Sequence, residues 1–169
     1  DIRALEISKI KEDFNIIQSS KMKEYVYLFS FGQKNHPFCA PFLANILEDL
    51  DLDKMRQAAK FFEGEHDFST YTARIHENTK SHRKVEYCEI LENTILEANF
   101  FPERSYALHI KSEGFMRYQV RMIMGALIQL GMGQLSLDHI RESLLEKNSI
   151  QLTYVAPGSG LLLNTLEFE

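Results

Sequence analysis

The chain has 169 residues, 44% of them hydrophobic and 25% charged, and its net charge is −5. This length predicts one domain, residues 1–169, with a hydrophobic core. The sequence contains no run of about 18 apolar residues, so we expect no membrane span. The composition excludes collagen, coiled coil and bulk disorder. Cys39 and Cys88 are too few for a disulfide framework, so we expect two reduced core thiols in a cytoplasmic protein. The first residue is Asp1 rather than Met, which suggests a piece of a longer protein.

The charge balance argues against a general nucleic-acid binder, whose surface is usually basic. Residues 72–84 are a local exception, with four basic side chains against Glu77. A solvated loop and a contact with RNA phosphates explain this stretch equally well. The net charge therefore does not decide which partners the protein has.

The first half of the chain alternates strand and helix patterns. Residues 25–31 are aromatic and β-branched, which predicts a buried strand. Residues 52–62 carry apolar side chains at helical spacing, and Gly64 is placed to cap that helix. Strands are expected at residues 85–96, with a turn near Glu92 and Asn93 as an alternative, and at residues 105–111, the latter with one face in solvent.

Residues 116–130 predict a helix with one continuous apolar stripe. Arg117 and Arg121 are four residues apart, so we expect them to project together from the edge of that stripe. Gly125 is unfavourable inside a helix by about 1 kcal/mol relative to alanine. Its presence indicates that another backbone or helix passes close by.

The C-terminal part predicts a second helix over residues 137–145, with Ser136 as its N-cap. A turn at residues 156–160 and an apolar strand at residues 161–168 follow. Together these elements predict an α+β fold with a mainly antiparallel sheet and helices packed on one face.

Neither the histidines nor the cysteines predict a reactive site. His66, His76 and His82 fit no standard zinc spacing, so we expect no metal. Nothing near Cys39 or Cys88 would promote a thiolate, and packing is the favoured role for both.

Two further features have a structural and a functional interpretation. The alternating aromatic residues of the first strand could stack on RNA bases, but the core is their usual location: Tyr25, Tyr27, Phe29 and Phe31. Asp67 is favoured as a helix cap rather than as an acid catalyst. On residue chemistry alone, a solvated face is also the favoured role of Arg117 and Arg121.

Four segments, in this order, resemble the tRNA pseudouridine synthase A (TruA) family. Residues 23–27 resemble its basic-x-Tyr-x-Tyr strand, and residues 64–68 its Gly-x-His-Asp-Phe turn. Residues 114–125 resemble its Gly-Phe-Leu-x-x-x-Val-Arg helix, which is the most specific of the four. Residues 156–163 resemble its terminal Ala-Pro-x-x-Gly-Leu-x-Leu strand. The resemblance spans nearly the whole chain.

The resemblance implies a cofactor-free isomerase that converts uridine to pseudouridine in the anticodon arm of tRNA, at positions 38–40. It also implies a cytoplasmic homodimer that binds tRNA. We expect no association with a membrane and no bound metal. The family's nucleophile is an aspartate in an Arg-(Thr/Ser)-Asp-x-Gly-Val-His-like segment. A search of this sequence finds no such segment, and these aspartates all lack that context: Asp13, Asp49, Asp51, Asp53, Asp67 and Asp138. We therefore expect the C-terminal part of the catalytic unit, inactive alone, with an exposed sheet edge.

The other site residues are carried over one by one from the resemblance. Tyr25 matches the tyrosine that contacts the target base and is the candidate proton acceptor at carbon 5. Arg121 matches the arginine that pairs with the catalytic aspartate, and Leu161 matches the leucine that lines the uracil pocket. Arg117 is an additional candidate for RNA contact. Ile17 replaces an arginine that is common in the family, which removes an expected phosphate contact there.

Two other functions remain open from the sequence. One is a non-catalytic RNA-binding or chaperone-like protein that keeps the scaffold without the aspartate. The other is a purely structural dimerisation domain, in which Arg121 would have no effect on tRNA chemistry.

Overall fold

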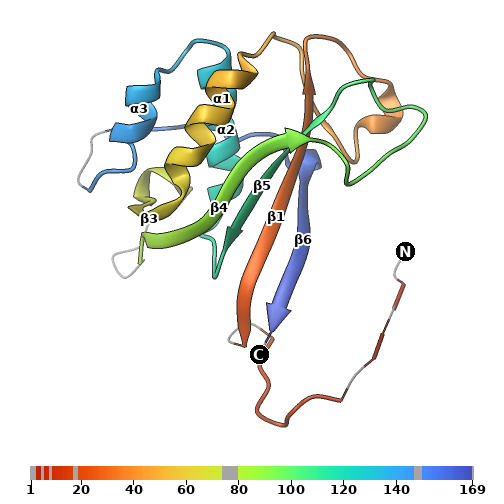
Figure 1. Ribbon diagram of the computed structural model, residues 1–169, viewed down its shortest axis with the longest axis vertical. Helices are drawn as coiled ribbons and strands as arrows, with labels where there is room; N and C mark the ends of the chain where they lie inside the picture. The colour runs from red at the N-terminus through yellow and green to blue at the C-terminus, as the bar shows by residue number, and fades with distance from the viewer. Residues whose placement is uncertain are drawn as a thin grey trace.

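The computed structural model describes residues 3–168 except 5, 8, 17–18, 74–79 and 147–149. Within these residues, a six-stranded sheet has the order β2-β1-β5-β4-β3, and β6 pairs with β1 beside β2 (Figure 1). The strands are β1 (Ser20–Phe31), β2 (Ala44–Ile46), β3 (Gly64–Asp67), β4 (His82–Glu92), β5 (Tyr106–Ser112) and β6 (Leu161–Phe168). Only the β1–β2 pair is parallel, so the expected mainly antiparallel sheet is confirmed.

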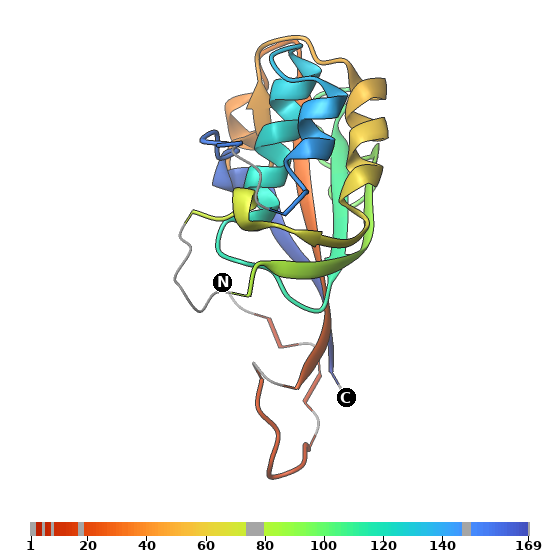
Figure 2. The same cartoon turned by 90° about the vertical axis from the view of Figure 1, so that its left-hand side faces the viewer.

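Helices cover one face of this sheet, as the sequence predicts. They are α1 (Leu52–Ala59), α2 (Gln119–Gly131) and α3 (Leu137–Glu142), and they lie side by side on that face (Figures 1 and 2). Tyr27 and Phe29 point from β1 into the core beneath them and are fully buried. The core role of these two aromatic residues is thus confirmed, while Tyr25 and Phe31 are only half-buried.

The opposite face of the sheet is covered by loops and by the short 3₁₀ helix η1 (Pro37–Cys39), not by α-helices. Val26 and Leu28 of β1 form a smaller cluster there with Cys39, Leu43 and Ala107. Cys39 and Cys88 are both free and buried, as expected for core thiols. Within the described residues, no helix reaches the length and apolarity that crossing a membrane requires.

One predicted boundary in the first half is wrong. Gly64 does not cap a helix: α1 continues into the short 3₁₀ helix η2 (Lys60–Phe62), and Gly64, at φ 101°, begins β3. β4 ends at Glu92, at the turn that the sequence offered as an alternative, where the side chain of Asn93 accepts a hydrogen bond from the backbone N–H of Ile95.

The arginine helix also begins later than predicted. Tyr118 has a left-handed backbone, with φ 65° and ψ 3°, so α2 begins only at Gln119. Arg117 therefore lies outside the helix. The two arginines do project together, as expected, but over the ring of Tyr118 rather than through helical spacing.

The close approach predicted at Gly125 is confirmed. A Cβ atom at this position would lie 2.2 Å from the carbonyl oxygen of Tyr154, which crosses over α2. Ser136 caps α3 by accepting a hydrogen bond from the backbone N–H of His139, also as predicted.

β6 lies at an edge of the sheet. Its one strand partner among the described residues is β1, and Leu163 is 52% exposed on it. The predicted exposed sheet edge is therefore present in this part of the chain, with unpaired backbone groups along its outer side.

Candidate functional site

A hollow of about 290 Å³ lies where α2 begins, beside β1 and β6. Its lining brings together all four residues singled out from the sequence, Tyr25, Arg117, Arg121 and Leu161. They come from segments far apart in the chain: Tyr25 from β1, Arg121 from the first turn of α2 with Arg117 just before that helix, and Leu161 from the start of β6.

Tyr25 faces the helices from the middle of β1. Its neighbours across the sheet are Ile110 on β5 and Leu163 on β6. Its ring packs edge-on against Phe115, with ring centroids 5.3 Å apart and an angle of 84° between the planes. The described residues supply no hydrogen-bond partner for its hydroxyl, which is therefore available to a ligand.

Arg121 is held in place from two sides. Its Nε donates a 2.7 Å hydrogen bond to the carbonyl oxygen of Ala156. The carbon of its guanidinium group lies 5.1 Å from the ring centroid of Tyr118, which is a cation–π contact. The described part of the chain gives its two Nη atoms no acceptor, so this end of the planar group can bind an anion with two hydrogen bonds.

Leu161 is positioned by the turn that precedes it. This turn is the 3₁₀ helix η4 (Gly158–Gly160), and the hydroxyl of Tyr27 donates a 2.7 Å hydrogen bond to the carbonyl oxygen of Pro157 just before it. Burial raises the pKa of Tyr27 well above its usual value, so this hydroxyl stays protonated as a donor. Gly160 allows the turn to approach β1 closely, because a Cβ atom there would lie 2.3 Å from the carbonyl oxygen of Leu28.

Arg117 is the most open of the four residues. Its side chain is exposed, and its guanidinium carbon lies 5.3 Å from the ring centroid of Tyr118. The backbone carbonyl of Arg117 accepts a 3.2 Å hydrogen bond from the hydroxyl of Thr72, which fixes the segment before α2. The two guanidinium groups thus share one aromatic ring at the mouth of the hollow.

Gln119 lines the same hollow and was not singled out from the sequence. It is 1% exposed, and its Oε1 accepts a 2.8 Å hydrogen bond from the backbone N–H of Met116. Its buried Nε2 has no partner among the described residues. The available signal was a polar residue four positions before Ile123, on the apolar stripe.

The expected helix-cap role of Asp67 is wrong: the N-cap residue of the following 3₁₀ helix, η3 (Ser69–Tyr71), is Phe68. The carboxylate of Asp67 accepts hydrogen bonds from the backbone N–H and the hydroxyl of Ser69, at 3.0 and 3.1 Å. Burial raises the pKa of Asp67, but hydrogen bonds from Ser81 and Ser69 outweigh it and leave the pKa below its usual value.

Two of the histidines that could suggest a metal site contact different groups and do not lie together as ligands. His66 lies 2.8 Å from the carbonyl oxygen of Glu63, and His82 lies 2.9 Å from the carboxylate of Glu146. His76 and Ile17 fall outside the described residues. In the described part, no group of three or more metal-binding side chains comes together.

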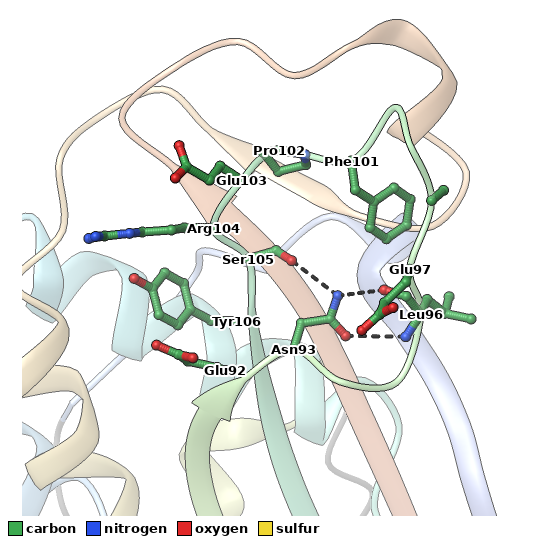
Figure 3. A pocket seen from close by; sticks show the side chains of 11 residues that line it. Glu92, Asn93, Leu96, Glu97, Phe101, Pro102, Glu103, Arg104, Ser105 and Tyr106 are labelled. Atoms are coloured by element: carbon green, nitrogen blue, oxygen red, sulfur yellow. Dashed lines mark hydrogen bonds between the residues drawn. The ribbon is translucent and has the colours of Figure 1, made fainter.

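A second hollow, of about 570 Å³, lies in the connection between β4 and β5 (Figure 3). Asn93 organises it: its Nδ2 donates to the carbonyl oxygen of Leu96 and to the hydroxyl of Ser105, at 2.8 and 3.0 Å. Its Oδ1 accepts from the backbone N–H groups of Ile95 and Leu96. The hydrogen-bonding capacity of this side chain is thus used within the loop.

Comparison with known proteins shows which family the sequence is similar to. The profile of the tRNA pseudouridine synthase family matches residues 58–169. The chain is 30% identical to tRNA pseudouridine synthase A 2 of Bacillus thuringiensis subsp. konkukian and of Bacillus anthracis, over 99% of its own length and 65% of theirs. It is 28% identical to tRNA pseudouridine synthase A of Acinetobacter baumannii, over 95% of its length and 57% of that protein.

These matches assign the chain to a class of RNA-modifying isomerases. The chain belongs to the tRNA pseudouridine synthase family. It spans somewhat less than two-thirds of the length of the curated relatives that it matches.

Proposed function

We propose that the protein containing this chain is a tRNA pseudouridine synthase that acts on uridines in the anticodon arm, and that the hollow at the start of α2 is its uracil site. The observation that carries this proposal is the convergence of Tyr25, Arg121 and Leu161 on one hollow. The reaction breaks the bond between uracil N1 and the ribose, turns the base and joins it through carbon 5, from which a proton leaves. The base must first leave the stacked stem for its atoms to be reached.

Arg121 is the residue that controls charge in this proposal. Its Nε is already bonded to Ala156, so a carboxylate would approach the free Nη end. A fixed positive charge there favours the ionised form of a nucleophilic aspartate. That aspartate is not found in a family-like segment of this sequence, and we propose that another part of the protein supplies it.

Tyr25 and Leu161 form the uracil side of the site. The hydroxyl of Tyr25 is the group that would accept the carbon-5 proton, which suits a side chain with no other hydrogen-bond partner in the described residues. Leu161 supplies an apolar wall, which limits water near the reacting base. Arg117, exposed at the mouth, would contact the RNA backbone.

The rest of the assignment is proposed on the same basis. The 169 residues form the C-terminal segment of the catalytic unit and are inactive alone. The complete protein works in the cytoplasm, without a cofactor or metal, as a homodimer. The open outer edge of β6 is where further chain or a second subunit would pair.

The net charge of −5 and the missing nucleophile segment favour one second candidate, a non-catalytic RNA-binding protein on the same scaffold. Such a protein would bind tRNA through the same arginines and release no product.

Tritium release from a tRNA transcript labelled at uridine carbon 5 tests the proposal. We expect release by the complete protein, and a loss of about 100-fold or more in Arg121→Ala, because a charged hydrogen-bond donor leaves the site. Arg104→Ala, in the hollow between β4 and β5, is the matched control and keeps full activity.

Three outcomes would contradict parts of this account. Folded complete protein that binds tRNA without releasing tritium supports the RNA-binding candidate instead. Full activity in Arg121→Ala removes this arginine from the site. Release by the 169-residue chain alone shows that the nucleophile lies within it.

A further inference from the structure

The backbone of Tyr118 has an uncommon conformation at the edge of the hollow. It is the one residue other than glycine with a positive φ among the described residues. The left-handed region brings Cβ close to the following carbonyl, so bulky residues rarely adopt it. Glycine or asparagine would fit this position with less strain.

Folding alone does not explain a tyrosine at this position. The side chain is 40% exposed, and the described residues give its hydroxyl no hydrogen-bond partner. It makes no capping hydrogen bond for α2; only its backbone carbonyl serves the helix, by accepting a 2.9 Å hydrogen bond from Met122. Strained residues that persist in a fold often do so at functional sites.

The ring contacts are the specific feature of Tyr118. The guanidinium carbons of Arg121 and Arg117 lie 5.1 and 5.3 Å from its centroid. The left-handed turn places the ring of Tyr118, just before α2, next to the side chain of Arg121 in the first turn of α2. The carbonyl oxygen of Ala156 accepts a hydrogen bond from the Nε of Arg121.

We propose that Tyr118 is a positioning residue that orients the guanidinium group of Arg121 toward the reacting centre. The ring and the Ala156 carbonyl together restrict the plane of that group and leave its Nη end free. A guanidinium that is oriented before the substrate arrives loses less conformational freedom when it binds an anion. This inference rests on the proposed function, because it assigns Arg121 to the uracil site.

The test uses variants of the complete protein, assayed for kcat, KM and thermal stability. Tyr118→Leu removes the aromatic face and is expected to lower kcat about 10-fold, with KM changed less than about twofold, because orientation rather than binding is lost. Tyr118→Phe keeps the face and restores most of kcat. Tyr118→Gly relieves the backbone strain, so it lowers kcat like the leucine variant without lowering Tm.

Phe61→Leu is the matched control. Arg141 lies over the Phe61 ring, with its guanidinium carbon 4.3 Å from the centroid, and neither residue lines the hollow at α2. Loss of that cation–π contact should leave kcat unchanged.

The outcomes separate this inference from the function on which it rests. Wild-type kcat in Tyr118→Leu, with activity lost in Arg121→Ala, overturns the inference and leaves the proposed function intact. A fall in kcat shared by Phe61→Leu, or matched by a fall in Tm, shows a general structural role and also overturns it. Full activity in Arg121→Ala overturns the proposed function itself.

Discussion

Two of the hollows in the described part of the chain differ in size and in the chemistry that they offer. The larger one, between β4 and β5, has about twice the volume, but the side-chain amide of Asn93 is bonded within its own loop. The smaller one, at the start of α2, contains Tyr25, whose hydroxyl has no partner in the described chain, and Arg121, whose Nη end has none either. It also contains the buried Nε2 of Gln119, without a partner there.

We therefore place the proposed site in the smaller hollow, although it has less volume. Its unpaired groups are buried or half-buried, whereas the charged residues of the larger hollow, such as Glu103 and Arg104, are exposed to water. Polar groups inside folded proteins are normally paired, so unpaired groups at a hollow call for an explanation. In the smaller hollow, the proposed uracil ligand would supply one. In the larger hollow, the polar groups of Asn93 already stabilise the fold, and its substitution should affect stability alone.

The largest expected effect is on activity, at Arg121. Arg121→Lys keeps the positive charge but loses the planar end with two donors, so we expect kcat to fall about 100-fold. The Tm should stay within about 2 °C of wild type, which corresponds to no more than about 0.5–1 kcal/mol. Wild-type activity in this variant would mean that a positive charge at this position is sufficient. The orientation of the guanidinium group by Ala156 and Tyr118 would then have no effect on activity.

The next effect tests the packing behind the smaller hollow. In Gly125→Ala, the new methyl group meets the carbonyl of Tyr154, two residues before the carbonyl that holds Arg121. We expect a loss of about 2 kcal/mol in unfolding free energy, despite the better helix propensity of alanine. Gly114→Ala, whose new methyl group would meet no atom within 4 Å, is the control. Equal stability of the two variants in urea titrations would contradict the close approach.

A smaller effect is expected in the larger hollow. Asn93→Ala removes hydrogen bonds to Leu96, Ser105 and Ile95, and should cost about 1–2 kcal/mol in unfolding free energy. Its kcat should equal that of wild type when measured well below the Tm. A lower kcat in the intact fold would place function in this hollow and reverse the contrast.

The smallest effect depends on pH and lies on the face of the sheet behind Tyr25. Burial raises the pKa of Glu24, but hydrogen bonds from His109, Asn164 and Thr165 outweigh it, so the folded-state pKa is below the usual value. Because the pKa of Glu24 is lower in the folded state, this carboxylate stabilises the fold at pH values above its unfolded-state pKa. The stabilisation is lost as the pH falls through the folded-state pKa.

Glu24→Gln should therefore lower stability by about 1 kcal/mol at pH 7, and by less as the pH drops below about 4. Unfolding titrations across this range measure the difference, with Glu103→Gln on the exposed loop as the control. A difference that does not change with pH would exclude this carboxylate as its source.

Most of the larger features of the fold could be predicted from the sequence. Side-chain periodicity was sufficient for four of the six strands and for the three helices, because burial decides these features. The close approach at Gly125 followed from the cost of a glycine inside a helix. The pattern missed β2 and β3, which have only three and four residues. It also failed where a single backbone conformation decides: the left-handed Tyr118 moved the start of α2 and left Arg117 outside the helix.

The candidate site divides in the same way. Tyr25, Arg121, Leu161 and Arg117 could be named because they lie in segments that resemble a known family. Gln119 and Tyr118 could not, because their significance lies in an unpaired atom and in a ring shared by two guanidinium groups. Both are consequences of three-dimensional packing rather than of spacing in the chain.

The most direct test of the central claim is a crystal structure of the complete protein with a tRNA that carries 5-fluorouridine at a modified position. The account predicts that the fluorinated base leaves the stem and lies between Tyr25 and Leu161, with the Nη end of Arg121 on a carboxylate beside it. A base seated in the hollow between β4 and β5, or an ordered complex with the hollow at α2 empty, would contradict it.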